Sequence, residues 1–216
     1  MTDPALLQKA RAYVEALIRE RKPEWVKYHG FHHAKSVVEA CRVIGAASHL
    51  GEEDLEVVVL AAWFHDVGYV EGIDRHEERS VDMAIAFLKE NGYPEEKIAQ
   101  LSGCVLATQI PQRPKNLLEE VLCDADIAHL AREDFLELSE LVRQEIEHRM
   151  SIKLTEEEWL TMNIDFVAGH RYFTDYAKTV FEGQRRRNLA ILKEKRDRLK
   201  MEPDPKTSGS ASANPR

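Results

Sequence analysis

The chain is poor in cysteine, in long apolar runs and in positive charge. It has three cysteines in 216 residues, with no Cys-x-x-Cys pair and no Cys–His zinc pattern, which argues against a disulfide framework and favours a reducing compartment. No stretch approaches the ~18 to 20 apolar residues of a membrane span, and the N-terminus lacks a basic segment followed by an apolar one. We therefore expect a cytoplasmic protein with no membrane partner.

The balance of charge narrows the range of partners. Lys and Arg number 30 against 38 Asp and Glu, which gives a net charge of −8. Binding to a nucleic-acid polymer needs a basic face that displaces counterions from phosphates, so we expect no such partner. A small phosphorylated substrate held by a few local cations is compatible with this charge.

The pattern of apolar residues predicts an all-α protein. Apolar side chains recur at spacings of three and four, which is typical of amphipathic helices, and the length is suited to one compact domain, which we place at residues 1–200. The expected helices cover residues 5–21, 32–49, 53–67, 80–89, 95–107, 117–130, 134–150, 156–168 and 172–200. Residues 202–216 lack large apolar side chains, so we expect a disordered tail at 201–216.

Histidine and aspartate residues occur in three short strings. These are residues 28–33 (YHGFHH), the pair His65-Asp66 at the end of an apolar run, and residues 123–126 (CDAD). Imidazole nitrogens and carboxylate oxygens together suit a divalent metal. A single buried histidine more often makes only a hydrogen bond, but a carboxylate at the edge of a core is costly unless it is paired or metal-bound. The three strings together therefore indicate a metal site.

The order of these strings resembles the HD-domain superfamily of metal-dependent phosphohydrolases. The signature of that family is a His, a His-Asp doublet and a final Asp, all on helices, and the resemblance covers about residues 25–130. It implies an HD-domain helical bundle, with additional C-terminal helices at about 131–200. It also implies a bound divalent ion, for which Mn, Fe, Co, Ni, Zn and Mg stay open, and we expect one ion per chain for the reason given below.

The resemblance also selects among the candidate ligands. The first ligand of the family lies about one turn beyond a Tyr-His pair, which favours His33 over His29 and His32. The final Asp of the family usually follows a small residue, which favours Asp126 over Asp124. The implied ligand set is listed here: His33, His65, Asp66 and Asp126.

Residues near the doublet distinguish branches of the family. Members with two metals carry further histidines; His76 matches the first of them, but Thr108-Gln109 stands where a pair is expected. This disfavours a second metal and also the di-iron oxygenases that share the fold. The guanosine-tetraphosphate hydrolases carry Glu-Asp where this chain has Tyr69-Val70, so that activity is disfavoured as well.

These features predict an enzyme that hydrolyses a phosphoester or phosphoanhydride of a nucleotide or similar metabolite: a phosphatase, a phosphodiesterase or a nucleotide pyrophosphohydrolase. We expect Asp66, His76 and Glu77 to act in catalysis, although His76 could instead be a surface residue of a capping segment. The candidate phosphate-binding cations are Arg75, Arg79, Arg113 and Lys115. The alternative is a nucleotide-sensing module that keeps the metal site without turnover. A homodimer is compatible with the long charged C-terminal helices.

Overall fold

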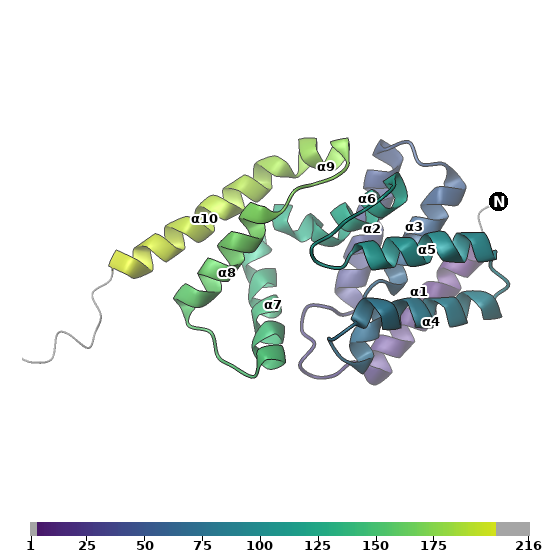
Figure 1. The fold of residues 1–216 in the computed structure, drawn as a ribbon, viewed down its shortest axis with the longest axis horizontal. Helices are drawn as coiled ribbons and strands as arrows, with labels where there is room; N and C mark the ends of the chain where they lie inside the picture. The colour runs from purple at the N-terminus through teal and green to yellow at the C-terminus, as the bar shows by residue number, and fades with distance from the viewer. Residues whose placement is uncertain (1–3, 202–216) are drawn as a thin grey trace, which may run out of the picture.

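A computed structural model describes residues 4–201, and every regular element in that range is helical (Figure 1). The first six α-helices are α1 (Pro4–Arg21), α2 (Phe31–Ala47), α3 (Glu52–Phe64), α4 (His76–Glu90), α5 (Glu95–Ala107) and α6 (Leu117–Asp126). The later ones are α7 (Phe135–Met150), α8 (Glu156–Gly169), α9 (Asp175–Val180) and α10 (Glu182–Met201). Two short 3-10 helices, η1 (Val67–Glu71) and η2 (Ile127–Ala131), follow α3 and α6. The all-α prediction is confirmed.

Helix α3 is the centre of the larger core. All residues from Glu56 to Phe64 are buried, and α1, α2, α5 and α6 pack around the helix. A helix that is apolar on nearly all sides is expected to be covered on all sides. Full burial of Leu60 and Phe64 contributes about 1.5–3 kcal/mol each to the free energy of folding. This packing fixes the C-terminal end of α3, where the His-Asp doublet follows.

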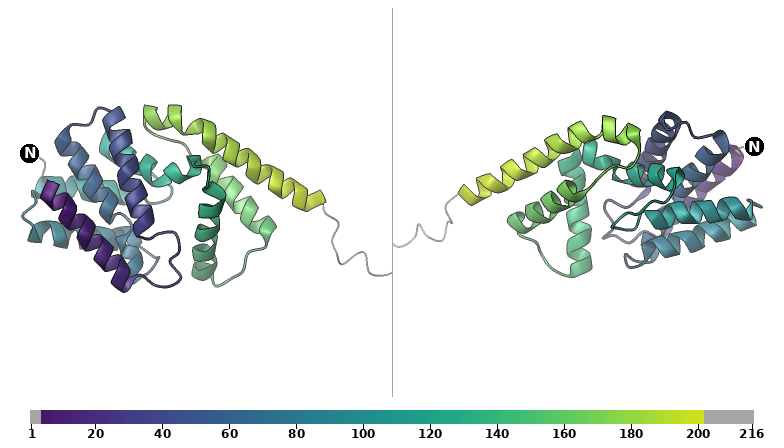
Figure 2. Two further views of the ribbon diagram at one scale, coloured as in Figure 1. Left: turned by 180° about the vertical axis from the view of Figure 1, so that it is seen from behind. Right: turned by 45° about the horizontal axis from the view of Figure 1, so that its top comes forward.

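The C-terminal helices have a core of their own. Apolar residues of η2, α7, α8 and α10 form a second cluster, which includes Phe135 and Leu192. Figures 1 and 2 show α7, α8 and α10 together on one side of the α1–α6 bundle. The Asn188 amide donates to the carbonyls of Leu130 and Arg132 at 2.9 and 2.8 Å, so α10 is tied directly to η2.

The expected helix boundaries differ from the observed ones at four places. The segments predicted at 53–67 and 117–130 change to 3-10 geometry after Phe64 and Asp126. Helix α4 begins at His76 rather than residue 80, so Ser80 lies inside the helix, where its hydroxyl accepts the Gly68 N–H at 2.9 Å. The helix predicted at 172–200 is divided at Phe181 into α9 and α10. The tail predicted at 201–216 lies outside the described residues except for Met201, which ends α10.

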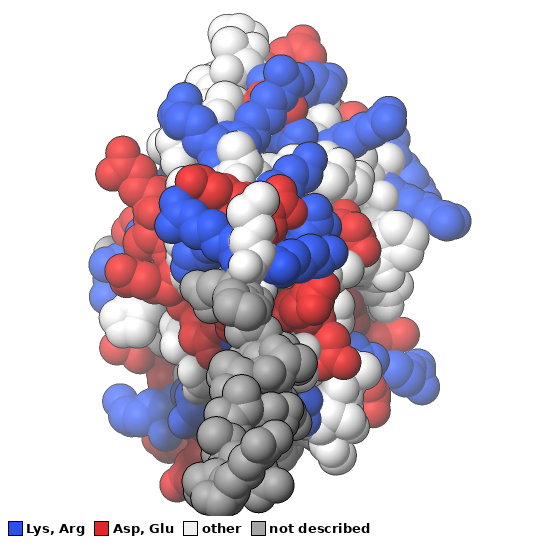
Figure 3. All heavy atoms as spheres, turned by 90° about the vertical axis from the view of Figure 1, so that its left-hand side faces the viewer, with Lys and Arg blue, Asp and Glu red and all other residues white. Residues whose placement is uncertain are grey.

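The outer face of α10 is charged. Figure 3 views the molecule from the end where α10 finishes, and shows Lys and Arg side chains gathered in its upper part, with Asp and Glu among and below them. Some of these charges pair within the helix, as Arg186 does with Glu182 at 2.7 Å. Such a face is typical of a solvated helix surface. None of the helices between residues 4 and 201 is both long and apolar enough to cross a membrane.

Candidate metal centre

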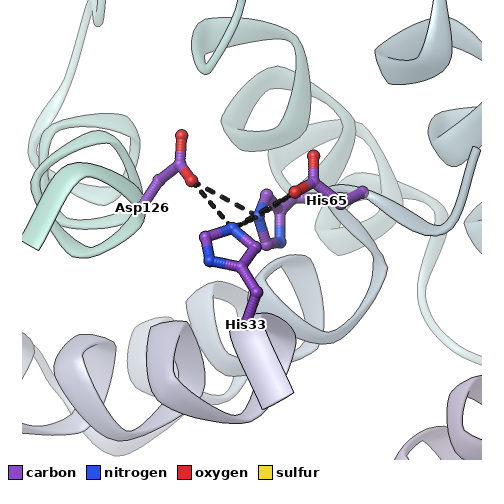
Figure 4. A group of neighbouring side chains, drawn as sticks. His33, His65 and Asp126 are labelled. Carbon is purple, nitrogen blue, oxygen red and sulfur yellow. Dashed lines mark hydrogen bonds and ion pairs between the residues drawn. The ribbon is translucent and has the colours of Figure 1, made fainter. Parts of the chain in front are cut away.

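Three helix ends bring the predicted ligands together. His33 lies in the first turn of α2, His65 and Asp66 follow the last residue of α3, and Asp126 is the last residue of α6. Figure 4 shows His33, His65 and Asp126 reaching toward one another from separate helices. Neighbouring residues of a helix diverge by about 100°, so the doublet cannot enclose an ion alone and needs ligands from other helices.

The distances within this group suit a shared ion. One ligand atom from each of the four residues lies within 4.8 Å of all the others. His33 Nε2 is 3.1 Å from His65 Nε2 and 3.1 Å from Asp126 Oδ1, and His65 Nε2 is 3.5 Å from Asp126 Oδ1. Donors that share an ion at about 2.1 Å lie roughly 3.0 to 3.4 Å apart at right-angled or tetrahedral positions. The group therefore has the spacing of a metal site.

One oxygen of Asp66 provides an independent test of this fit. Its Oδ2 forms ion pairs with His33 Nε2 at 3.2 Å and His65 Nε2 at 3.1 Å. Within residues 4–201 this buried oxygen has no hydrogen-bond partner. A buried carboxylate oxygen without a hydrogen bond is costly, and a cation between the four residues would satisfy it.

A backbone contact orients His65. Its Nδ1 lies 2.8 Å from the Ala62 carbonyl oxygen, which only a protonated Nδ1 can use as a hydrogen bond. Nε2 is then the nitrogen that faces the other three residues. An outer contact of this kind is typical of metal-binding histidines, because it fixes both the tautomer and the ring.

The electrostatics of the group favour charged carboxylates. Burial alone lowers the pKa of His33 and His65, but Asp66 and Asp126 outweigh burial and raise the pKa of both imidazoles. In return, the two histidines hold the pKa of Asp66 and Asp126 well below its usual value despite burial. The carboxylates therefore favour protons on the imidazoles, and an ion would compete with those protons.

His76 lies beside this group rather than in it. Its Nδ1 is 3.0 Å from the Ile73 carbonyl oxygen, and its Nε2 is 3.5 Å from Asp66 Oδ1, the second oxygen of that carboxylate. Gly68 permits this placement, because a Cβ on it would lie 2.0 Å from the His76 carbonyl oxygen. Glu77 extends its carboxylate to 3.4 Å from His76 Nδ1 and is not part of the four-residue group.

The predicted phosphate-binding cations are not gathered at the group. The Arg79 guanidinium donates to the backbone carbonyls of Gly68 and Gly72 and so braces η1. Arg75 is exposed and pairs with Glu78 at 3.5 Å. Arg113 and Lys115 are exposed in the segment before α6.

A different set of cations lines a cavity that reaches two of the four residues. This cavity of about 590 Å³ touches His33 and Asp126 and lies between α2, α6, η2 and α7. Lys27, Lys35 and Arg132 are among its lining residues. Another cavity, of about 560 Å³ between α1, α2 and α3, includes none of the four residues.

Sequence reasoning did not identify Tyr28, Tyr69 and His129, which also surround the group. Burial, followed by the nearby carboxylates Asp66 and Asp126, raises the pKa of Tyr28 and Tyr69, so both phenols are neutral at pH 7. Burial lowers the pKa of His129 to about 4, and its ring is 5.2 Å from that of Tyr28. The one feature of the sequence that could have pointed to His129 is its position about one helical turn after Asp126.

Asp124, the alternative ligand, has a different environment. It is fully buried and accepts the N–H of Phe173 at 2.9 Å and both the N–H and the hydroxyl of Thr174 at 2.7 Å. These bonds tie α6 to the segment before α9. Among residues 4–201, the group built on Asp126 is the one set of three or more such donors with metal-site spacing.

Comparisons with known proteins agree with this architecture. Residues 30–132 match the family model described as HD domain. No curated protein matches the chain. Among solved structures, the chain is similar to a Lactobacillus plantarum protein determined as a structural-genomics target, with 15% sequence identity and a TM-score of 0.67. The match covers 93% of this chain and 98% of that one. At this identity the likeness shows the fold alone.

Proposed function

Residues 30–132 are an HD domain, so the chain belongs to the HD-domain superfamily of metal-dependent phosphohydrolases, and we propose that it hydrolyses a phosphoester or phosphoanhydride bond of a nucleotide or similar small metabolite. The observation that carries this proposal is the group of four side chains with the spacing of a metal site, in which the buried Oδ2 of Asp66 has no hydrogen-bond partner among residues 4–201. Two nitrogen and two oxygen donors suit several divalent ions.

His33, His65, Asp66 and Asp126 would hold the ion. When bound, a divalent ion activates a water molecule at neutral pH and polarises a phosphoryl oxygen. The side chains around it have separate tasks. The neutral phenols of Tyr28 and Tyr69 keep their protons and can donate hydrogen bonds beside the ligand carboxylates.

His76 is suited to hold or deliver a proton next to the ion. Burial lowers the pKa of His76, but the Asp66 carboxylate and then Glu77 outweigh it and raise the pKa above the usual value. Its Nε2 faces Asp66, and the Ile73 carbonyl keeps the ring in place. A positioned imidazole of this kind typically contributes 10²- to 10⁴-fold to proton transfer.

The cavity beside His33 and Asp126 supports a nucleotide-sized substrate. Its volume of about 590 Å³ lies within the ~300–1,000 Å³ usual for small-molecule sites. Lys27 can supply positive charge for phosphate oxygens, while the Arg132 guanidinium pairs with Asp134 at 2.6 to 2.7 Å. Aliphatic side chains such as Leu138 and Leu141 supply an apolar wall. A substrate with both anionic and apolar parts fits this lining.

The test is product release from a nucleotide panel. Metal-stripped protein is supplied with each divalent ion in turn. Phosphate and pyrophosphate are measured separately for mono-, di- and triphosphate nucleotides, and the nucleoside monophosphate product is measured for cyclic nucleotides. We expect release that needs both an ion and Asp66, so that Asp66→Asn is inactive while Asp82→Asn, which changes an exposed carboxylate on α4, keeps wild-type activity. Undiminished release by Asp66→Asn would overturn the proposal. Metal and nucleotide binding without any product would instead favour a nucleotide-sensing module.

A further inference from the structure

One buried carboxylate of the C-terminal helices reaches into the HD bundle. Glu145 of α7 is 1% exposed and is among the largest fully buried side chains of the described residues. A buried carboxylate is costly unless charged or polar groups satisfy both of its oxygens. Its partners therefore show which part of the molecule it serves.

All of the hydrogen-bond partners of Glu145 lie in one turn. Oε1 accepts the backbone N–H groups of Lys27 and Tyr28 at 2.6 Å and of His29 at 3.1 Å, and Oε2 contacts His29 Nδ1. This turn leads into α2, whose first turn holds His33. Burial raises the pKa of Glu145, but His29 and the backbone donors outweigh it and lower the pKa, so the carboxylate is charged at pH 7.

Glu145 leaves one nitrogen of His29 available. Nδ1 is engaged, and within the described part of the chain Nε2 makes no hydrogen bond. The His29 side chain is 21% exposed, so solvent or a ligand can reach it.

The ring of His29 is held next to the metal group. It stacks flat on Tyr69, with 4.4 Å between centroids and 5° between planes, and its centroid is 5.5 Å from that of His33. Tyr69 in turn lies 4.2 Å from His76. The three rings of His29, Tyr69 and His76 thus form a continuous row beside the ligand carboxylates.

We propose that His29 is a further catalytic residue that contacts the phosphoryl group of the substrate through Nε2, and that Glu145 is the residue that positions it. The C-terminal helices then complete the active site instead of only packing against it. This inference rests on the proposed hydrolase function. If Glu145 only fastened α7 to the bundle, His29 would be dispensable for turnover.

The test compares His29→Gln, Glu145→Gln and a matched control in the full chain. Glu147→Gln is the control, because Glu147 is a buried carboxylate of the same helix whose partners are Arg143, Lys153 and the Leu154 N–H, not the turn before α2. The readouts are kcat, KM, the Kd for the metal, and binding of inorganic phosphate to metal-loaded protein by calorimetry.

We expect His29→Gln to lower kcat about 10²-fold, with metal affinity within threefold of wild type. Glu145→Gln should lower kcat about 10- to 100-fold, and adding it to His29→Gln should cost little more, because both changes remove the same contact. Glu147→Gln should retain wild-type kcat. Since His29→Gln leaves the buried carboxylate in place, it keeps the test valid even if Glu145→Gln does not fold.

Two outcomes would overturn the inference. One is wild-type kcat and wild-type phosphate affinity in His29→Gln. The other is a full multiplicative loss in the double variant, which would separate the roles of Glu145 and His29. If wild-type protein releases no product from any nucleotide, the hydrolase proposal fails, and the phosphate-binding measurement alone then tests the role of His29. Phosphate binding at least tenfold weaker in His29→Gln than in wild type would support the contact. Equal binding in both proteins, or no binding to wild type, would reject it.

Discussion

Two aspartates of α6, only two residues apart, should have opposite phenotypes when changed to asparagine. Asp124 accepts three hydrogen bonds from Phe173 and Thr174, whereas Asp126 directs Oδ1 to the imidazoles of His33 and His65. Asp124→Asn should therefore destabilise the fold and leave metal binding intact. Asp126→Asn should abolish metal binding.

The size of the Asp124 effect follows from its contacts. In asparagine an NH2 group replaces one of the two carboxylate oxygens, and this group cannot accept the hydrogen bonds that the oxygen received. If Oδ2 is the oxygen replaced, the two bonds from Thr174 are lost. Hydrogen bonds to a charged group contribute about 1.5–3 kcal/mol each, so we expect a loss of roughly 3–5 kcal/mol in the free energy of unfolding. For a chain of this size that lowers Tm by about 6–20 °C.

Calorimetric unfolding with chelator and then with added metal separates the two roles. An ion at 100 times its Kd stabilises the folded state by about 2.7 kcal/mol, which raises Tm by roughly 5–11 °C. We expect Asp124→Asn to start from a lower Tm and to show this full rise, and Asp126→Asn to show none. A metal-induced rise in Asp126→Asn together with its loss in Asp124→Asn would refute the assignment.

Three further predictions concern protons and packing. Because the carboxylates raise the pKa of His33 and His65, a metal ion must displace protons when it binds. The Kd for the metal should therefore increase about 10- to 100-fold for each pH unit below the pKa of these histidines. A Kd that calorimetry finds to be independent of pH would contradict this. Gly68→Ala should lower kcat at least tenfold, because the added Cβ would lie 2.0 Å from the His76 carbonyl oxygen; unchanged kinetics would exclude this. Burial lowers the pKa of His170 to about 4, so the unfolded chain takes up its proton first as pH falls. Urea unfolding should lose about 2 kcal/mol of stability between pH 7 and pH 5 through this residue, and His170→Gln should reduce the total loss by that amount; an unchanged loss in the variant would contradict this.

The fold class could be predicted because periodicity and composition act locally. Apolar spacing located the helices except for the division of 172–200 into α9 and α10, and the confirmed resemblance to the HD-domain superfamily gave the architecture. The ends of helices were predicted less well. The helix expected from residue 80 begins at His76, and the Ser80 hydroxyl accepts the N–H of Gly68 twelve residues away, a contact that leaves no mark in the local sequence.

The metal donors were accessible to prediction because their order along the chain is distinctive. His33, His65, Asp66 and Asp126 lie together as that order implies, and their role as ligands stays a prediction. The surroundings were not accessible in the same way. Glu145 meets the turn at residues 27–29 from more than a hundred positions away, and only the folded chain shows the pairing.

The proposed hydrolase activity depends on one ion held by His33, His65, Asp66 and Asp126. The most direct measurement is the rate of phosphate or pyrophosphate release from the best nucleotide while metal-free protein is titrated with its preferred divalent ion. We expect a rate that rises linearly and saturates at one ion per chain, and no hydrolysis at any metal concentration in Asp66→Asn. Full activity in the presence of a strong chelator, or equal activity in that variant, would contradict it.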